Sequence, residues 1–326
     1  MKKITAIAPS NIAFIKYWGK EDSILRLPTN ASISMNLSNL TTTTTVEFDS
    51  TLKEDDITID GLKNTDEGNR VTKHLDRIRI IADIQTKARV VSINSFPSSS
   101  GLSSSASGFA ALTIAGVEAL GLSLSEKELT ILARLGSGSA SRSIPDGFVE
   151  WRYGITSDES YAVSLYPATH WDLVDIVVIV SDKKKEFPTS IAMDGAGTSP
   201  KFLPRIAGME EKIKRFKKAL AKKDFETFGT IIEEEALEMH DVIETQNPPY
   251  HYISDETKSV MTAVKQWRKE GVSVYFTINT GHDIHLICEK KDEERVFEKV
   301  QTSPHILRSI VNYPAPGAHL SNVPLF

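Results

Sequence analysis

Cysteine is almost absent from this sequence: its 326 residues include one, Cys288. A single thiol excludes an intramolecular disulfide framework and a metal site built from several cysteines. No apolar run is long enough to cross a membrane, and Pro9 and Asn11 interrupt the N-terminal segment, which therefore does not resemble a signal peptide. We expect a reduced protein of the cytoplasm.

Positive charge is not in excess either. The chain has 38 Lys and Arg residues against 43 Asp and Glu residues, a formal net charge of −5. This balance offers no basic stripe for nucleic acid and no polybasic patch for a membrane. With 40% hydrophobic and 25% charged residues, the composition is that of a globular protein, and the chain is long enough to form two lobes.

Small residues are concentrated in one segment, residues 96–108 (FPSSSGLSSSASG). The residues before it, 88–96, are rich in β-branched side chains and predict a strand. The residues after it, from Phe109 to Leu120, are apolar at helical spacing and predict a helix that Gly121 ends. A small-residue loop at a helix N-terminus directs backbone N–H groups toward one point, which favours a phosphate-binding loop. The alternative is a serine-rich flexible linker.

A second candidate anion site lies near the N-terminus, where Lys16 and Lys20 flank the residues Tyr17, Trp18 and Gly19. Two cations and a phenol in one apolar neighbourhood can bind an anion. The alternative is a pair of surface lysines whose stems cover apolar side chains. Because a phosphate loop is expected elsewhere, we favour the anion site.

Two arginines have unusual surroundings. Arg142 stands alone among the glycines and serines of residues 136–151 (GSGSASRSIPDGFVEW), which suits a pocket wall that meets a carboxylate or phosphate. A plain turn with an arginine salt bridge is the alternative. Arg70 falls in the first turn of a predicted helix, where the helix dipole does not favour a cation, so we interpret it as an anion-binding residue.

The remaining patterns predict an α+β fold. Strands are expected at residues 2–8, 27–40, 41–48 and 173–180, with a hairpin tip at Asp60-Gly61 and a second hairpin over 273–279 and 283–288. Helices are expected at residues 70–82, 126–135, 210–221, 225–243, 255–269 and 293–300. The four histidines His240, His251, His282 and His285 lack metal-ligand spacing, and we expect them to be structural or solvated.

Together these segments resemble the diphosphomevalonate decarboxylase family of the GHMP small-molecule kinase superfamily. PSSSGLSSSA, residues 97–106, fits the superfamily's phosphate loop, and NIAFIKYWGK, LPTNASIS and GSGSASRSIPDGFVEW are similar to the decarboxylase branch. The resemblance covers nearly the whole chain. It implies a two-lobed GHMP-kinase-like α+β fold, with an N-terminal lobe over residues 1–170, a C-terminal lobe over residues 171–326, and an active-site cleft between them.

The resemblance also implies the reaction. ATP, with Mg²⁺, would phosphorylate the 3-hydroxyl of mevalonate 5-diphosphate, and loss of phosphate and CO2 would then give isopentenyl diphosphate. The expected partners are a mevalonate phosphate and ATP, with neither nucleic acid nor a membrane involved. A homodimer is left open as the assembly.

Residue roles follow from the family pattern. The diphosphate end of the substrate is expected to meet Tyr17, Trp18, Gly19, Lys20 and Arg70. The substrate loop is expected to comprise Ser137, Gly138, Ser139, Ala140, Ser141 and Arg142, with Arg142 on the carboxylate beside Asn11, Lys16 offsetting charge at the reacting centre, and Thr198 as a further contact. The ATP loop is expected to comprise Pro97, Gly101, Leu102, Ser103, Ser104, Ser105 and Ala106, with the Ser105 hydroxyl nearest Mg²⁺ and Lys183 and Lys184 on the ATP phosphates.

One departure from the family concerns the catalytic base. The family pattern F-D-A-G-P-N, whose aspartate is assigned as the base, is replaced by residues 278–283, INTGHD. Asn279 stands in the aspartate position, and an amide does not accept a proton at neutral pH. We expect Asn279 to orient the 3-hydroxyl and Asp283, across the turn, to act as the base. The alternative is that Asp283 only caps the turn.

This departure leaves several functions open besides the leading one. They are a phosphomevalonate decarboxylase that makes isopentenyl phosphate, a kinase that does not decarboxylate, a decarboxylase of an already 3-phosphorylated mevalonate, and a non-catalytic ligand sensor of the same fold. The sensor is disfavoured because it would not need a carboxylate-binding arginine at the reacting end.

Overall fold

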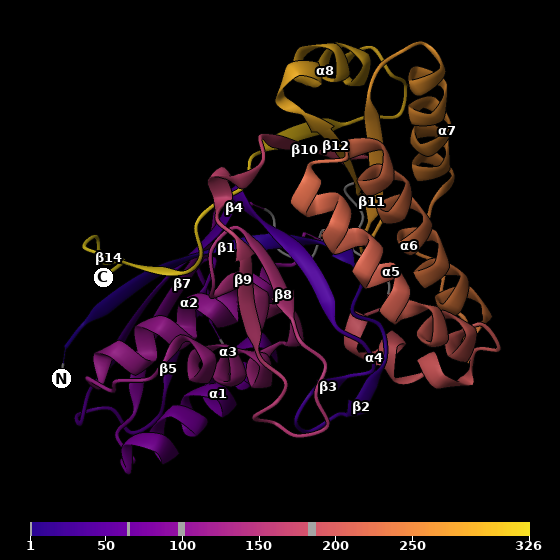
Figure 1. The fold of residues 1–326 in the computed structure, drawn as a ribbon. Helices are drawn as coiled ribbons and strands as arrows, with labels where there is room; N and C mark the ends of the chain where they lie inside the picture. The colour runs from indigo at the N-terminus through magenta and orange to yellow at the C-terminus, as the bar shows by residue number, and fades with distance from the viewer. Residues whose placement is uncertain (1, 64–65, 97–101, 182–186) are drawn as a thin grey trace.

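The computed structural model describes residues 2–63, 66–96, 102–181 and 187–326. Its described strands form an eight-stranded sheet, a four-stranded sheet and a small two-stranded ribbon (Figure 1). Helices cover both main sheets, as expected for an α+β fold. The last strand, β14 (His319–Ser321), pairs with the first, β1 (Ile4–Ile15), so the C-terminal segment returns to the first sheet.

The first sheet has the order β14-β1-β4-β7-β5-β6, and β8 and β9 extend it from the first half of β4. Its further strands are β4 (Ser32–Phe48), β5 (Asp56–Ile59), β6 (Leu62–Lys63), β7 (Ala88–Asn94), β8 (Phe148–Trp151) and β9 (Ala162–Tyr166). The second sheet, β11-β12-β10-β13, consists of β10 (Leu173–Ile179), β11 (Val274–Ile278), β12 (Ile284–Glu289) and β13 (Arg308–Asn312). The ribbon pairs β2 (Lys20–Asp22) with β3 (Leu27–Pro28).

The helices form groups on either side of the sheets. The first group is α1 (Asp66–Ala82), α2 (Ser104–Ala119) and α3 (Glu126–Gly136), followed by the short 3-10 helix η1 (Gly138–Ser143). The second is α4 (Thr189–Asp194), the 3-10 helix η3 (Ala196–Thr198), α5 (Phe202–Lys222) and α6 (Phe225–Thr245). The third is α7 (Asp255–Lys269) and α8 (Glu293–Gln301).

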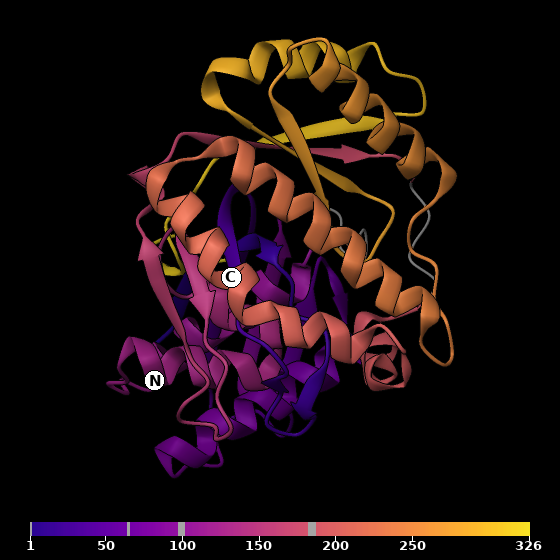
Figure 2. The same cartoon turned by 45° about the vertical axis from the view of Figure 1, so that its right-hand side comes forward.

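Three of the apolar clusters among the described residues hold these layers together. Leu75 of α1 and Leu112 of α2 pack on Val46 of the first sheet. Phe228 of α6 belongs to a core that joins the inner faces of both sheets, and Figures 1 and 2 show α5 and α6 lying between the two sheets. Val264 of α7 packs on the outer face of the second sheet. The long α6 is therefore the element that connects one lobe with the other.

Most elements agree with the sequence predictions. The helices expected at 126–135, 225–243, 255–269 and 293–300 are confirmed within two residues, and α1 begins four residues before its predicted start. The hairpin tip at Asp60-Gly61 is confirmed, with φ of 48° and 79°, as in a type I′ turn. Gly121, at φ 66°, directly follows the C-cap of α2, as predicted.

Two predicted boundaries are wrong for reasons connected with proline. The first strand was expected to end before Pro9, but β1 continues to Ile15 because Pro9 stands beside a register shift, where a strand tolerates proline. The helix expected at residues 210–221 begins at Phe202. Its Pro204 lies in the first turn, where no intrahelical N–H bond is lost.

Candidate active site

A cavity of about 690 Å³ lies where β1, the N-terminus of α2, η1, α4 and the end of β11 meet. Its volume is typical of a small-molecule site. Most of its wall comes from the first lobe, whereas Thr189, Met239, Asn279 and Thr280 come from elements beyond residue 171. Both halves of the chain therefore contribute to one site.

The β1 strand and the residue directly after it place three residues in this wall. Asn11 and Ala13 line the cavity because alternate residues of a strand share a face. A register shift between Ala13 and Ile15 changes the alternation, so that Lys16 lines the cavity and Ile15 is buried in the core. The bulge is thus what brings the lysine to the site.

Arg142 is held by polar side chains rather than by an acid. Its Nη1 donates to Ser32 Oγ at 2.7 Å and its Nη2 to Asn11 Oδ1 at 3.2 Å. Nε is buried without a hydrogen-bond partner among the described residues. Burial lowers the pKa of Arg142 to about 10, which still leaves the guanidinium charged at neutral pH. A buried cation with this geometry is suited to a carboxylate ligand.

Close packing of residues 137–143, the segment that contains Arg142, holds this arginine in place. Gly138 opens η1, and a Cβ built there would lie 2.8 Å from Tyr17 Cε1 and 3.0 Å from Trp151 Cη2. A side chain at this position would push the loop away from the two rings. Asn11 Nδ2 also donates to Ser143 Oγ at 2.8 Å, which connects β1 with the end of η1. The glycine and serine content of this segment therefore reflects a tight fit.

Lys16 is the second buried cation. Its Nζ donates to the Ala13 carbonyl at 2.7 Å and to Asn279 Oδ1 at 3.1 Å. Burial is the main reason that its pKa falls to about 7 from an ordinary value of 10.5. The chain therefore brings Lys16 and Asn279 together although 263 residues separate them.

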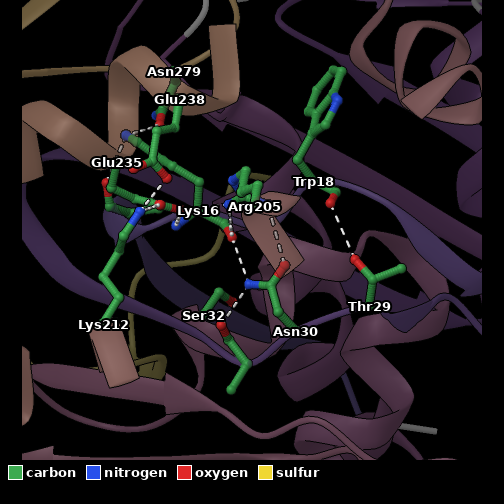
Figure 3. A network of polar contacts seen from close by, with 12 residues as sticks. Lys16, Trp18, Thr29, Asn30, Ser32, Arg205, Lys212, Glu235, Glu238 and Asn279 are labelled. Carbon is green, nitrogen blue, oxygen red and sulfur yellow. Dashed lines mark hydrogen bonds and ion pairs between the residues drawn. The ribbon is translucent and has the colours of Figure 1, made fainter. Parts of the chain in front are cut away.

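A buried ion-pair network lies behind Lys16 (Figure 3). Glu235 of α6 pairs with Arg205 of α5 and, at 2.9 Å, with Lys212 Nζ. The same carboxylate accepts the backbone N–H of Lys16 at 3.1 Å, and Asn30 Nδ2 donates to the Lys16 carbonyl at 3.0 Å. These bonds fix the backbone of Lys16 from both sides.

Further cations line another part of the cavity. Lys20 pairs with Asp194 at 2.5 Å. Arg26 Nε and Arg70 Nη2 donate to the carbonyls of Leu135 and Gly136 at 3.2 Å, and neither forms an ion pair with a described carboxylate. Burial, followed by the charge of Arg26, lowers the pKa of Arg70. Two guanidiniums that repel one another are suited to binding a multiply charged anion between them.

The N-terminus of α2 completes the site. Ser103, at φ 59°, precedes the helix in a left-handed conformation, and Ser103, Ser104 and Ser105 all line the cavity. Ser105 Oγ lies 3.2 Å from Ser137 Oγ, so the serine loop and the substrate loop are in contact. The helix dipole and its free N–H groups favour an anion here.

The structure brings most of the predicted site residues to the cavity. Those that line it are Asn11, Lys16, Tyr17, Trp18, Lys20, Arg70, Ser103, Ser104, Ser105, Ser137, Gly138, Ser139, Arg142 and Asn279. Those that are described but do not line it are Gly19, Leu102, Ala106, Ala140, Ser141, Thr198 and Asp283. Pro97, Gly101, Lys183 and Lys184 lie outside the described residues.

Thr198 and Asp283 are two of the expected site residues that lie off the cavity. Thr198 Oγ1 donates to the Gly195 carbonyl at 2.6 Å and accepts the N–H of Asn247 at 2.7 Å, so its hydroxyl already connects two segments of the second lobe. Asp283 is buried at the start of β12 and is not part of the cavity wall. The role of Asp283 as the base stays an expectation from the sequence.

Sequence reasoning missed several residues of the site. Arg26 lines the cavity, Ser32 orients Arg142, and Arg205 and Glu235 support Lys16. A signal existed for the last pair: Glu235 lies four residues from both Ile231 and Met239, on the buried stripe of α6. A charged residue on an apolar stripe must find a buried partner. No comparable pattern marked Arg26 or Ser32.

No group of three His, Cys, Asp or Glu side chains in the described part of the chain could hold a metal ion. Mg²⁺ commonly keeps several waters and is bound through substrate phosphates, with few protein ligands. A single hydroxyl beside a phosphate site, such as that of Ser105, fits this mode. Among residues 2–63, 66–96, 102–181 and 187–326, no helix is long and apolar enough to span a membrane.

Comparison with known proteins gives the same family along the chain. Residues 8–162 match the model of the diphosphomevalonate decarboxylase-like N-terminal domain, and residues 175–313 match that of the mevalonate 5-diphosphate decarboxylase C-terminal domain. Diphosphomevalonate decarboxylase of Candida albicans is 34% identical over 315 residues, covering 91% of this chain and 87% of that protein.

Solved structures agree in fold. Mevalonate diphosphate decarboxylase from Staphylococcus aureus is 37% identical, with a TM-score of 0.94 and 98% of each chain covered. A complex described as MDDEF with MVAPP, AMPPCP and magnesium is 35% identical, with a TM-score of 0.92 and the same coverage. The similarity thus includes a structure that holds a nucleotide analogue and magnesium together.

Proposed function

Because the chain belongs to the diphosphomevalonate decarboxylase family, we propose that it converts mevalonate 5-diphosphate and ATP into isopentenyl diphosphate, ADP, phosphate and CO2. The observation that carries the proposal is the buried guanidinium of Arg142, which lines the cavity and forms no ion pair with a described carboxylate. A buried cation that pairs with no described carboxylate is suited to an acid on the substrate.

Binding at both ends positions the substrate. Arg142, oriented by Asn11 and Ser32, binds the carboxylate that leaves as CO2. Arg26 and Arg70, with Lys20, bind the diphosphate. Fixing both ends places the 3-hydroxyl between them and converts the reaction with ATP into one between positioned groups.

The α2 N-terminus receives the phosphates of ATP, and the Ser105 hydroxyl would hold Mg²⁺, which supplies neutralising charge to those phosphates. The 3-hydroxyl oxygen bonds to the γ-phosphorus while the bond from that phosphorus to ADP breaks. Phosphoryl transfer needs mainly positioning and charge stabilisation from the protein. Lys16, close to the Arg142 end of the cavity, adds polar stabilisation where the new phosphate forms.

The second half of the reaction breaks two bonds of the phosphorylated intermediate. The C3–O bond breaks and phosphate leaves, while the bond to the carboxylate carbon breaks and its electron pair forms the new double bond. Arg142 holds the carboxylate through its planar guanidinium until CO2 leaves. The products are CO2, phosphate and the alkene diphosphate.

A second candidate function has one observation in its favour. Asp60 and Glu67 are the carboxylates among the described residues of the cavity wall, and both belong to the β5–α1 region rather than to the surroundings of Lys16 and Asn279. A substrate that already carried a 3-phosphate would need no base. A decarboxylase of 3-phosphorylated mevalonate is therefore the alternative, although it leaves the serine loop at α2 without a use.

The experiment is a comparison of substrates. Purified protein is incubated with mevalonate 5-phosphate, mevalonate 5-diphosphate or a 3-phosphorylated mevalonate, with and without ATP, and CO2, ADP and phosphate are measured separately. We expect the highest kcat/KM with mevalonate 5-diphosphate, and one ADP for each CO2. CO2 release from the 3-phosphorylated mevalonate without ATP, with none from mevalonate 5-diphosphate and ATP, would establish the alternative, and ADP without CO2 would indicate a kinase.

Two further proposals and one open question concern the organisation of the protein. We retain the division into lobes at residues 1–170 and 171–326, with β14 belonging to the first lobe's sheet. A location in the cytoplasm is proposed from the sequence, and fractionation of cells tests it. The sequence leaves a homodimer open as the assembly, and sedimentation equilibrium of the purified protein decides it.

A further inference from the structure

The hydrogen bonds of Lys16 leave one position on its nitrogen without a partner among the described residues. A neutral lysine amine has two N–H groups and one lone pair, whereas the ammonium has three N–H groups and none. Nζ donates twice, to the Ala13 carbonyl at 2.7 Å and to Asn279 Oδ1 at 3.1 Å. Because Lys16 lines the cavity, the third position on Nζ is the one available to a ligand. In the neutral form that position holds the lone pair.

The charges around Lys16 do not stabilise its ammonium enough to offset burial. Burial is the largest influence and brings its pKa to about 7. The neighbouring charges come from four elements: Glu235 of α6 and Asp175 of β10 raise the pKa, whereas Arg142 of η1 and Arg205 of α5 lower it. His240 of α6, which donates to the Asn279 carbonyl at 3.0 Å, has a pKa lowered to about 4 and is neutral.

The acid closest to this lysine is already engaged. Glu235 pairs with Arg205 and Lys212, and the group of Lys16 that it accepts is the backbone N–H rather than Nζ. Figure 3 shows Glu235 between Arg205 and Lys212, with Asn279 beside Lys16. Nζ itself therefore meets two uncharged oxygen atoms, those of Ala13 and Asn279.

The amide at position 279 determines which of the two partners, residue 279 or Lys16, can take up and release a proton. A carboxylate at 3.1 Å from Nζ would hold Lys16 as an ammonium, and that carboxylate would be the base. An amide oxygen accepts the same hydrogen bond without the charge, so the lysine can lose its proton. With an amide rather than a carboxylate at position 279, the group that titrates is therefore Lys16 and not its partner.

We propose that the neutral amine of Lys16 is the base for the 3-hydroxyl in the reaction proposed above, and that Asn279 orients it. The O–H bond of the substrate breaks, an N–H bond forms on Nζ, and the oxygen bonds to the γ-phosphorus as ADP leaves. The ammonium then faces the new phosphate ester. When the C3–O bond breaks, Lys16 returns the proton to the departing phosphate, which leaves as hydrogen phosphate, and the amine is ready for another cycle.

The first test is the pH dependence of kcat with saturating mevalonate 5-diphosphate and Mg²⁺-ATP. A base must be deprotonated to work, so kcat should rise with pH through an apparent pKa near 7. In Asn279→Asp the new carboxylate keeps Lys16 charged and acts as the base in its place. The rise in kcat should therefore occur at least about one pH unit lower than in the wild type. An unchanged profile in Asn279→Asp would overturn the proposal, as would a profile that loses its rise in Asp283→Asn.

The second test separates a base from a fixed positive charge. Lys16→Ala should lose at least about a hundredfold in kcat. Methylamine should restore part of the loss, in proportion to its neutral fraction as the pH is raised, whereas guanidinium, a permanent cation, should not. Equal rescue by guanidinium would show that Lys16 acts only through charge and would overturn the proposal. If Lys16→Ala does not fold, the Asn279→Asp profile decides.

The inference rests on the proposed function, and its failure can be told apart from that of the function. Wild-type protein that makes neither ADP nor CO2 from any mevalonate phosphate would overturn both. Turnover with one ADP for each CO2, but without the pH rise and the amine rescue, would overturn only the role of Lys16.

Discussion

At the scale of the residue, the site depends on two buried cations whose charged ends meet no carboxylate among the described residues. Arg142 hydrogen-bonds Ser32 and Asn11, and Lys16 Nζ hydrogen-bonds Ala13 and Asn279. Burying such groups is costly unless a ligand or a change of protonation compensates. The two residues differ in how the cost of burying their charge is offset. Arginine stays charged and needs a bound anion, whereas lysine can lose its proton and become neutral.

Arg142→Lys tests the arginine. The substitution keeps a positive charge but removes the planar fork, and with it the paired contacts to Ser32, Asn11 and the substrate. We expect kcat to fall at least about a hundredfold in a protein that still folds. Arg152→Lys is the matched control, because Arg152 is about half exposed and hydrogen-bonds Tyr161 outside the cavity. Near-normal CO2 release by Arg142→Lys would remove the guanidinium from the mechanism.

The lowered pKa of Lys16 predicts a pH effect on stability that does not depend on turnover. Between pH of about 7 and 10.5, the unfolded chain holds a proton on Lys16 that the folded chain has lost. The free energy of unfolding should therefore rise with pH in this window, by up to about 1.4 kcal/mol per unit from this group. Urea denaturation of wild type and Lys16→Met at several pH values between about 7 and 10.5 measures this rise in the free energy of unfolding. The part of the rise that comes from Lys16 should be absent in the variant.

Lys201→Met is the control for that series. Lys201 is half exposed and pairs with Asp241 on the surface, so its removal should leave the slope against pH as in the wild type. Parallel slopes in wild type and Lys16→Met would mean that Lys16 stays charged in the folded protein.

At the scale of the element, two helix N-termini illustrate different uses of the same geometry. Helix α3 has a capping box in which Ser125 and Glu128 satisfy one another's backbone N–H groups. Helix α2 has no side-chain cap on Ser103, and its first turn lines the cavity. The uncapped helix is the one that can give its N–H groups to a phosphate.

Replacing one serine at the N-terminus of each helix by alanine tests this contrast. Ser105→Ala should lower kcat/KM for ATP by about tenfold or more, because a hydrogen bond to a charged group is lost. Calorimetry should show the affinity for mevalonate 5-diphosphate largely unchanged. Ser125→Ala should instead lower the free energy of unfolding by about 1 kcal/mol and leave kcat/KM for ATP unaltered. Lost substrate affinity with normal nucleotide affinity in Ser105→Ala would mean that the two sites are assigned the wrong way round.

The sequence predicted helices better than it predicted short strands. Periodicity over many residues determines α6 and α7, and the same face that repeats along the helix is the face that is buried. Strands β8 and β13 have four and five residues, too few to show a period. They form because partner strands, β4 and β10, pair with them from elsewhere in the chain.

At the scale of the whole molecule, a buried ion-pair network within residues 205–238 is hydrogen-bonded to the backbone of Lys16. Glu235 and Arg205 are both almost completely buried, and their partners include the backbone of Lys16 at the end of β1. Arg205→Met would leave a buried carboxylate with one side-chain cation fewer. We expect a loss of about 3–5 kcal/mol in the free energy of unfolding, measured with urea.

The matched control is again Lys201→Met, which removes a surface pair between the same two helices, α5 and α6. Its cost should be less than about 1 kcal/mol. If both variants cost equally little, the network does not hold the lobes together, and the position of Lys16 must depend on other contacts.

The contacts between the lobes are also the ones that could not be predicted from the sequence. Patterns identified Lys16, Arg142 and the serine loop as candidate sites separately, since each stands out from its own neighbours. The meeting of Lys16 with Asn279, and the exclusion of Asp283 from the cavity wall, depend on how β11 and its turn are packed against β1. That packing is a property of the assembled lobes rather than of any local segment.

The central claim is that the 3-hydroxyl becomes the phosphate that leaves. Mevalonate 5-diphosphate labelled with ¹⁸O in its 3-hydroxyl, incubated with this protein and Mg²⁺-ATP, tests it directly, with mass spectrometry of the released phosphate. The account predicts one ¹⁸O atom in each phosphate, one ADP for each CO2, and no label in water. Label in water, or unlabelled phosphate beside normal CO2 release, would contradict it.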